Sequence, residues 1–409
     1  MKKVLFALAG VFAAFAQERE GAAPPAGAKS AYQLEMERQW KLHPTLAIGA
    51  QAPDFNLAGI DGKKHTLADY KSSKVLAVMF ICNHCPASQL YENRMKKMAD
   101  DYHAKGVQFI AIQPNAVSAI SARELNYTDV DDSLESMVIH AKFRNFNFPY
   151  LYDGDTQSTA KAYGCLCTPH IFIFDKDRKL RYMGRVDDSR YADPSTVKSP
   201  DARNALAALV DGKPVPVEVT RPAGCSTKWI NHNEVHQLQQ AWTNNPVTLE
   251  TINAAGVASL VKNPTSKVRM INVWATWCAP CVAEFPGLVS ISQRMSNRDF
   301  ELITISVDDQ SDQAKALAFL QKQHAAASNR LLRSLSAEGR TTNNYLFTGA
   351  NLDALMQALD PQAPGPVPYT LIIAPGGKIV YRHSGEVDSS ELLGQLIDIM
   401  GPYYPQAGR

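Results

Sequence analysis

The stretch MFICNHCPAS (residues 79–88) places Cys82 and Cys85 on either side of two residues, after an apolar run and before a helix-like pattern. The stretch NVWATWCAPCVAEFP (residues 272–286) holds a second pair with the same spacing. Short apolar runs predict buried strands, and apolar residues that recur every three or four positions predict a helix. We therefore expect each cysteine pair at the junction between a buried strand and a helix.

The segments that follow the two pairs also repeat. The first pair is followed by a strand-like run at residues 107–113 and then by a hairpin-like segment directly after Pro169. The second pair is followed by a strand-like run at residues 301–307 and by a hairpin-like segment directly after Pro368. One plan that occurs twice in a chain of 409 residues predicts two α/β domains in tandem.

The N-terminus has the pattern of an export signal. Two lysines precede an apolar run that ends in small residues, and we expect cleavage after Ala16. The run is too short for a stable membrane anchor. Without Lys2 and Lys3 the chain keeps 40 of its 42 basic residues against 40 acidic ones, so neither nucleic acid nor an anionic membrane is indicated as a partner. The expected segments are a signal peptide (1–16), a flexible lead (17–44), domain 1 (45–218), a linker (219–245) and domain 2 (246–403).

Cysteine pairs at the start of a helix suit thiol-disulfide exchange. The helix dipole stabilises a thiolate there, and the next turn holds the second cysteine within reach. We predict that Cys82 and Cys278 attack, and that Cys85 and Cys281 resolve the mixed disulfide. A protonated His84 would add positive charge beside the Cys82 thiolate and make the first pair the stronger oxidant.

The prolines are the next candidate site residues. Pro169 and Pro368 each precede a hairpin, where a cis peptide bond after Thr168 or Val367 would turn the backbone toward the cysteines. Ordinary trans prolines in turns are the alternative.

The other cysteines leave alternatives open. Cys82, Cys85, Cys165 and Cys167 could bind zinc or copper in an exported metal carrier. The spacing of Cys165 and Cys167 is unusual for structural zinc, so we favour redox chemistry without a cofactor or a metal. Cys225 is left over as an odd cysteine.

Domain 2 resembles the exported thioredoxin-like reductases of cytochrome c maturation and cysteine reduction. The stretches NVWATWCAPCVAEFP, VPYTLIIAPGGKIV and HSGEVD carry the resemblance over residues 246–401. It implies that Glu284 lies near the cysteine pair and takes part in its proton transfers; a solvated helix glutamate is the alternative. Asn272 stands where cytosolic thioredoxins carry a buried aspartate.

Domain 1 resembles the redoxin branch that includes alkyl hydroperoxide reductases. The stretches PDFNL, CNHCP, FPYLYDGDTQSTAKAYG, CTPHIFIFD, GRVDDSR and GCSTKW carry the resemblance between residues 53 and 229. Peroxiredoxins place threonine where Cys82 stands and their peroxidatic cysteine where Cys85 stands. The resemblance also places Cys167 near Cys82, where it could capture an intermediate or pair with Cys165 as an auxiliary redox couple.

Together these observations predict an α/β protein of two thioredoxin-like folds in tandem, each with a central mixed sheet flanked by helices. We expect an exported thiol-disulfide oxidoreductase of the periplasm or cell envelope. Its partners would be protein or small-molecule thiols and disulfides, with a thiol electron donor for domain 2. The alternatives are a thiol peroxidase in domain 1 that domain 2 reduces, and the metal carrier.

Overall fold

The computed structural model describes residues 37–38, 41–126, 128–230, 234–363 and 365–401. The expected signal peptide lies outside the described residues. The chain divides into two compact units, which we call the first and second domains. The first domain comprises residues up to 115 and residues 141–227, and the second comprises residues 116–140 and the chain from 228 onward.

The first domain is built on a mixed sheet of seven strands in the order β2-β1-β5-β4-β3-β7-β8. The central strand β3 runs parallel to β4 and antiparallel to β7. All residues of β3 and β7 are buried, and all of them except His170 are apolar, as is typical of strands that are covered on both faces. The strands are β1 (Asn56–Gly59), β2 (Lys64–Thr66), β3 (Val75–Phe80), β4 (Val107–Gln113), β5 (Tyr150–Tyr152), β7 (His170–Phe174) and β8 (Leu180–Gly184).

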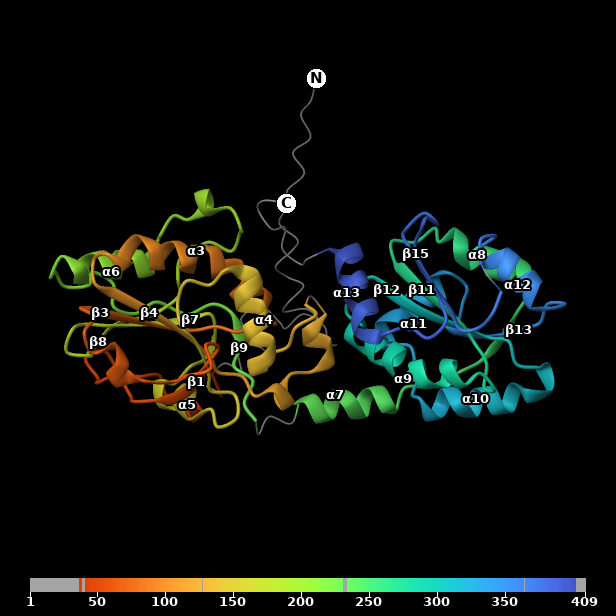
Figure 1. Ribbon diagram of the computed structural model, residues 1–409, viewed down its shortest axis with the longest axis horizontal. Helices are drawn as coiled ribbons and strands as arrows, with labels where there is room; N and C mark the ends of the chain where they lie inside the picture. Colours follow the sequence, from red (N-terminus) through yellow and green to blue (C-terminus); the bar gives the residue numbers. More distant parts are fainter. Residues whose placement is uncertain (1–36, 39–40, 127, 231–233, 364, 402–409) are drawn as a thin grey trace, which may run out of the picture. The chain divides into compact units, whose positions relative to one another are not determined.

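Helices α3 and α6 cover one face of this sheet (Figure 1). The hydroxyl of Tyr102 on α3 donates to the carbonyl of Arg203 on α6 at 3.2 Å, which joins the two helices. The α-helices of the first domain are α3 (Pro86–His103), α5 (Ser158–Tyr163) and α6 (Asp201–Val210), and its 3₁₀ turns are η1 (Leu67–Tyr70) and η4 (Pro194–Thr196). Helix α4 (Leu134–Arg144) contains the domain boundary after residue 140.

A separate two-stranded pairing belongs to the first domain. Strand β6 (Cys167–Thr168) pairs antiparallel with β9 (Cys225–Ser226). The linker expected from the sequence includes residues 219–227, but these residues belong to the first domain, where Cys225 and Ser226 take part in this pairing.

The second domain contains a mixed sheet of six strands in the order β10-β13-β12-β11-β14-β15. Its central strand, β11, runs parallel to β12 and antiparallel to β14. The strands are β10 (Glu250–Ile252), β11 (Val268–Trp274), β12 (Phe300–Ser306), β13 (Asn344–Phe347), β14 (Tyr369–Ile373) and β15 (Ile379–Ser384).

Helices cover both faces of this second sheet (Figure 1). Ile271 and Val273 of β11 pack on the face that carries α8 and α12. Val268 and Met270 pack on the opposite face with α9 and α13. This alternation follows from the two-residue period of a strand. The α-helices are α7 (Glu234–Thr243), α8 (Ala254–Lys262), α9 (Ala279–Arg294), α10 (Gln313–Lys322), α11 (Asn329–Ala337), α12 (Leu352–Leu359) and α13 (Ser389–Met400), and the 3₁₀ turns are η2 (Val117–Ala119), η3 (Ala122–Leu125) and η5 (Gln310–Asp312).

The expected fold class is confirmed, since each domain has a central mixed sheet flanked by helices. Among the described residues, no helix combines the length and the apolar character needed to cross a membrane.

Candidate functional site

The first cysteine pair lies between the end of β3 and the start of α3. Cys85 is the N-cap residue of α3, and Pro86 occupies the first turn, where proline is favoured. Cys82 and Cys85 are both buried and hold thiols rather than a disulfide.

Thr168 contacts both sulfurs of this pair. The Cys82 Sγ lies 3.0 Å from the Thr168 hydroxyl, and the Cys85 thiol donates to the Thr168 carbonyl at 3.3 Å. The peptide bond between Thr168 and Pro169 is cis. The loop before Pro169 therefore lies against the cysteine pair, as the resemblance implied.

The surroundings of Cys85 favour its thiolate. Complete burial by itself raises the pKa of this thiol, but hydrogen bonds with Cys225 and Cys82 and the charge of His84 lower it. The net result is a pKa for Cys85 well below the ordinary value of a thiol. The charge of His84 therefore acts on Cys85.

The second cysteine pair lies at the start of α9. Cys278 is the N-cap residue, and its sulfur accepts a hydrogen bond of 3.3 Å from the backbone amide of Cys281. The two cysteines form a disulfide with a Cα–Cα distance of 5.3 Å. The peptide bond between Val367 and Pro368 is cis.

Glu284 is buried one helical turn after Cys281. Its Oε1 accepts a hydrogen bond of 2.8 Å from the Asn272 side-chain amide, and its Oε2 accepts one of 2.8 Å from the backbone amide of Val387. Burial raises the pKa of the Glu284 carboxyl, and these two hydrogen bonds only partly offset the rise. The interpretation of Glu284 as a solvated helix residue is therefore wrong.

The strand registers allow a position-by-position comparison of the two sites. In the first domain, Phe80 of β3 pairs with His170, the residue after the cis-proline. In the second domain, Val273 of β11 pairs with Tyr369, which also follows the cis-proline. Phe80 and Val273 are therefore equivalent positions of the two sheets.

Five residues after these positions the chain reaches Cys85 in the first domain and Cys278 in the second. Both residues are helix N-caps, so the strand and helix comparisons agree. The place of Cys281 is taken in the first domain by Ser88, whose hydroxyl accepts a hydrogen bond of 3.1 Å from the Cys82 amide. The two CxxC motifs are thus offset by one helical turn, which their equal spacing in the sequence conceals.

Cys165 and Cys167 are buried and close to the same loop. The Cys165 thiol donates to the Cys167 carbonyl at 3.5 Å, and the Cys167 thiol donates to the Pro169 carbonyl at 3.6 Å. Burial raises the pKa of Cys165 to about 12 and raises that of Cys167 well above the ordinary value. Both cysteines therefore hold neutral thiols at neutral pH, which is typical of packing residues.

Two residues of the first site were not singled out from the sequence. Thr168 was named only as the residue before Pro169, although it contacts both sulfurs. Cys225 was left over as the odd cysteine, although its side chain forms a hydrogen bond with Cys85. The sequence signal that pointed to Cys225 was Gly224, directly before it, since a glycine next to a strand residue often marks a site where another stretch of backbone approaches closely.

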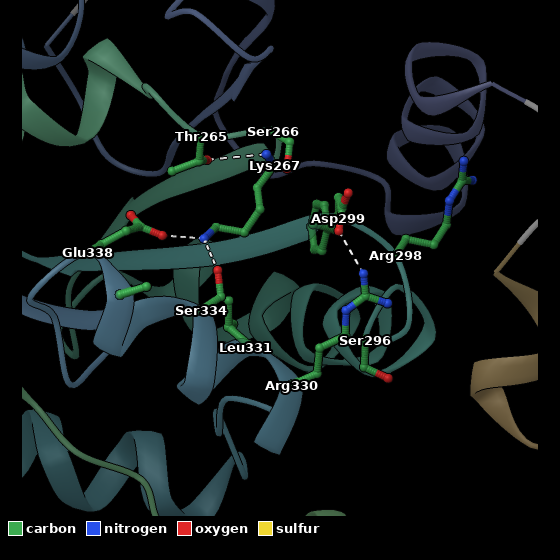
Figure 2. Close-up of a pocket in the computed structure, with 12 residues that line it drawn as sticks. Thr265, Ser266, Lys267, Ser296, Arg298, Asp299, Arg330, Leu331, Ser334 and Glu338 are labelled. Carbon is green, nitrogen blue, oxygen red and sulfur yellow. Dashed lines mark hydrogen bonds and ion pairs between the residues drawn. The ribbon is translucent and has the colours of Figure 1, made fainter. Parts of the chain in front are cut away.

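A pocket of about 220 Å³ opens at the other end of the second sheet (Figure 2). Several of its polar side chains pair with one another: Lys267 binds Ser334 at 2.5 Å and also Glu338, and Arg330 binds Asp299 at 2.7 Å. The pocket lies beside the start of β11, whereas the cysteines follow the end of that strand. At the usual rise per residue of a strand, the two ends of β11 are roughly 20 Å apart. It is therefore separate from the redox site.

Comparisons with known proteins identify both domains. Residues 48–183 match the model of the AhpC/TSA family, and residues 246–396 match the Redoxin family. The chain therefore carries two redoxin-type thioredoxin-like domains in tandem, as expected from the sequence.

The curated relatives include thiol-disulfide oxidoreductases. The chain is 27% identical over 138 residues to the thiol-disulfide oxidoreductase ResA of Geobacillus thermodenitrificans, a match that covers 33% of this chain and 68% of that protein. It is 30% identical over 122 residues to the thiol:disulfide interchange protein DsbE homolog of Paracoccus denitrificans, covering 29% of this chain and about half, 51%, of that protein. A crystal structure of an uncharacterized conserved protein from Geobacillus kaustophilus is 40% identical and matches with a TM-score of 0.41, covering 46% of this chain and 95% of that one.

Proposed function

We propose that the chain is a thiol-disulfide oxidoreductase with one exchange site in each domain. The observation that carries this proposal is that a cysteine caps a helix in each domain while a second cysteine lies within reach of it. A helix N-cap stabilises a thiolate, and the neighbouring cysteine can resolve a mixed disulfide.

In the second domain the thiolate of Cys278 attacks one sulfur of a partner disulfide. A mixed disulfide forms, and the first partner thiolate leaves and takes up a proton. The Cys281 thiol then gives its proton to Glu284 and attacks the sulfur of Cys278. The Cys278–Cys281 disulfide forms and the second partner thiolate leaves, so that two electrons have passed from the pair to the partner.

In the first domain the geometry favours Cys85 as the attacking residue and Cys82 as the resolving one. Cys85 holds the N-cap position and has the lowered pKa. This reverses the roles that we predicted from the sequence, where the first cysteine of each motif was taken as the nucleophile.

The partners in this proposal are protein or small-molecule disulfides and thiols, with a thiol donor that reduces the second domain. The curated relatives are named for thiol-disulfide exchange, which supports this class of partner. Export to the periplasm or cell envelope, with cleavage after Ala16, rests on the sequence pattern alone.

A thiol peroxidase activity of the first domain is the second candidate. The position of Cys85 at a helix N-cap and its lowered pKa favour it. The Cys85 thiolate would attack the outer oxygen of a hydroperoxide, forming a sulfenic acid while the alcohol leaves with a proton. The Cys82 thiol would then displace the hydroxyl as water and form the Cys82–Cys85 disulfide.

Two assays on the reduced full chain separate these candidates. The first follows reduction of insulin or of oxidised glutathione, and the second follows consumption of hydrogen peroxide. We expect Cys278→Ser and Cys85→Ser each to lower disulfide reduction, whereas the buried Cys165→Ser control leaves it unchanged. Peroxide consumption without disulfide reduction would favour the peroxidase, and a chain that reduces no disulfide would refute the main proposal. Cys281→Ser and Cys82→Ser should trap mixed disulfides with partners for identification.

A further inference from the structure

A short strand of the first domain covers the loop that contacts the redox cysteines. Strand β9 pairs antiparallel with β6, and the register places Cys225 opposite Thr168. Thr168 in turn contacts the sulfurs of Cys82 and Cys85. The backbone pairing thus brings Cys225 to the centre of the first site from a distant part of the chain.

Gly224 makes this close approach possible. A Cβ atom at this position would lie 2.0 Å from the Thr168 carbonyl oxygen and 2.5 Å from its carbon. Both are backbone atoms of the residue before the cis-proline, so a side chain could not be accommodated by a rotamer change. Only glycine lets β9 lie flat on the loop at this point.

The strand is anchored on both flanks. On one side the Thr227 amide donates to the Leu166 carbonyl at 3.1 Å, and the Thr227 hydroxyl donates to the Cys165 carbonyl at 3.1 Å. On the other side the Thr220 amide donates to the Met183 carbonyl at 3.0 Å. These contacts hold the chain on both sides of Cys225 in place.

Cys85 lies between two thiols. Its sulfur forms hydrogen bonds with the side chains of both Cys82 and Cys225. Ser88 stands where the second domain has its resolving cysteine, so the thiols available to resolve Cys85 come from outside α3. Cys82 is buried, whereas Cys225 is partly exposed.

We propose that Cys225 is a third redox cysteine of the first domain, which forms a disulfide with Cys85 and connects the buried pair to solvent. This inference rests on the proposed exchange function. In the oxidised site, the thiol of an incoming reductant would attack the Cys225 sulfur of the Cys85–Cys225 disulfide, because Cys225 is the partly exposed member of that disulfide.

The exchange steps balance as follows. After the Cys85 thiolate has attacked a partner disulfide, Cys225 loses a proton and attacks the Cys85 sulfur. The Cys85–Cys225 disulfide forms, and the leaving partner thiolate takes up that proton. Cys82 can then attack Cys85, which forms the Cys82–Cys85 disulfide and returns Cys225 to a protonated thiol. The partner disulfide gains two electrons, and two cysteine thiols lose them.

The test uses the full chain with Cys82→Ser, so that Cys225 is the remaining neighbour of Cys85. The reduced protein is treated with oxidised glutathione, alkylated, digested with trypsin without reductant and analysed by mass spectrometry. Cys85 lies in the tryptic peptide 75–94 and Cys225 in the peptide 204–228. The double variants Cys82→Ser/Cys225→Ser and Cys82→Ser/Cys165→Ser are compared, and circular dichroism checks that each is folded.

We expect a cross-link between peptides 75–94 and 204–228 in Cys82→Ser and in the double variant that lacks Cys165. In the double variant that lacks Cys225, glutathione should remain on Cys85 for longer. We expect its release from Cys85 to be slower than in Cys82→Ser by about tenfold or more, because no intramolecular thiol from Cys225 displaces it. A glutathione adduct on Cys85 beside an unlinked Cys225, both in Cys82→Ser and in the double variant that lacks Cys165, would overturn the inference and leave the exchange function standing. If glutathione reacts with Cys85 neither in these variants nor in the unaltered chain, both the inference and exchange at this site are refuted.

Discussion

The side-chain amide of Asn272 donates a hydrogen bond of 2.8 Å to the Oε1 of Glu284, and the same amide reaches the Thr370 hydroxyl at 3.0 Å. The carboxyl group of Glu284, one helical turn after Cys281, is thus held by a neutral donor that stands where the resemblance places the buried acid of cytosolic thioredoxins. Because the donor is neutral, Glu284 is the group of this buried contact that can carry a proton.

The first prediction concerns the Glu284 proton. In the proposed mechanism the Glu284 carboxylate accepts the proton of Cys281, so resolution of the mixed disulfide should slow as the pH falls through the pKa of Glu284. Burial raises this pKa, and the decline should begin above the usual value of about 4.3. Glu284→Gln should remove this step from the pH profile of single-turnover disulfide reduction. Glu391→Gln on the exposed side of α13 is the matched control, and an unchanged profile in Glu284→Gln would rule out the proton-transfer role.

The second prediction concerns the charge of His84. It lowers the pKa of Cys85 and favours the thiolate of the reduced pair. His84→Ala should raise the pKa of Cys85 and make the reduction potential of the first site more negative. A change of about 30 mV corresponds to roughly 1.4 kcal/mol for this two-electron couple. Equilibration with glutathione redox buffers measures the potential, and alkylation rates against pH measure the pKa. No change in either quantity would show that this charge does not act on the site.

The third prediction tests the contact between Gly224 and Thr168. In Gly224→Ala the added Cβ would collide with the Thr168 backbone, so β9 should separate from β6. We expect less protection of the Thr227 amide in hydrogen exchange and a more reactive Cys225. Gly394→Ala is the control, because a Cβ there meets no atom within 4 Å and the helical backbone tolerates alanine. Unaltered exchange at Thr227 would mean that the strand adjusts without separating.

The fourth prediction concerns a buried ion network that stabilises the second sheet. Glu301 accepts hydrogen bonds of 3.2 Å from the Arg269 Nε and 2.6 Å from the Arg340 Nη2, and its side chain is fully buried. Glu301→Gln should leave buried positive charge uncompensated and lower the free energy of unfolding of the second domain by about 3–5 kcal/mol. Urea unfolding measures this value. Asp211→Asn removes the exposed pair with Lys213 and should change stability by less than about 1 kcal/mol; a similar loss in both variants would contradict the assignment.

The fold could be predicted from the sequence because its signals are local. The apolar runs before Cys82 and Cys278 gave the central strands, and the prolines before each hairpin marked the turns that approach the cysteines. The offset of the two motifs was also readable in principle. Pro86 directly follows Cys85, and proline is favoured at the first position of a helix, so the helix cap had to be the second cysteine of that motif.

The place of Cys225 could not be derived in the same way. Its contact with Cys85 depends on the pairing of β6 with β9, which joins segments that are far apart in the chain. Such a pairing is set by the tertiary fold and leaves no periodic pattern in two residues of sequence. The burial of Glu284 is similar, because its partner Val387 comes from a loop beyond the second hairpin.

Strand β9 also affects which molecules can use the first site. Its main chain occupies the hydrogen-bonding edge of Cys167 and Thr168, whereas no described strand pairs with the residues before Pro368. An extended polypeptide that bound along this edge would have to compete with a tethered segment, whose effective concentration is in the millimolar range or higher. We therefore expect the first domain to discriminate against extended protein strands more strongly than the second domain, and to accept compact disulfides.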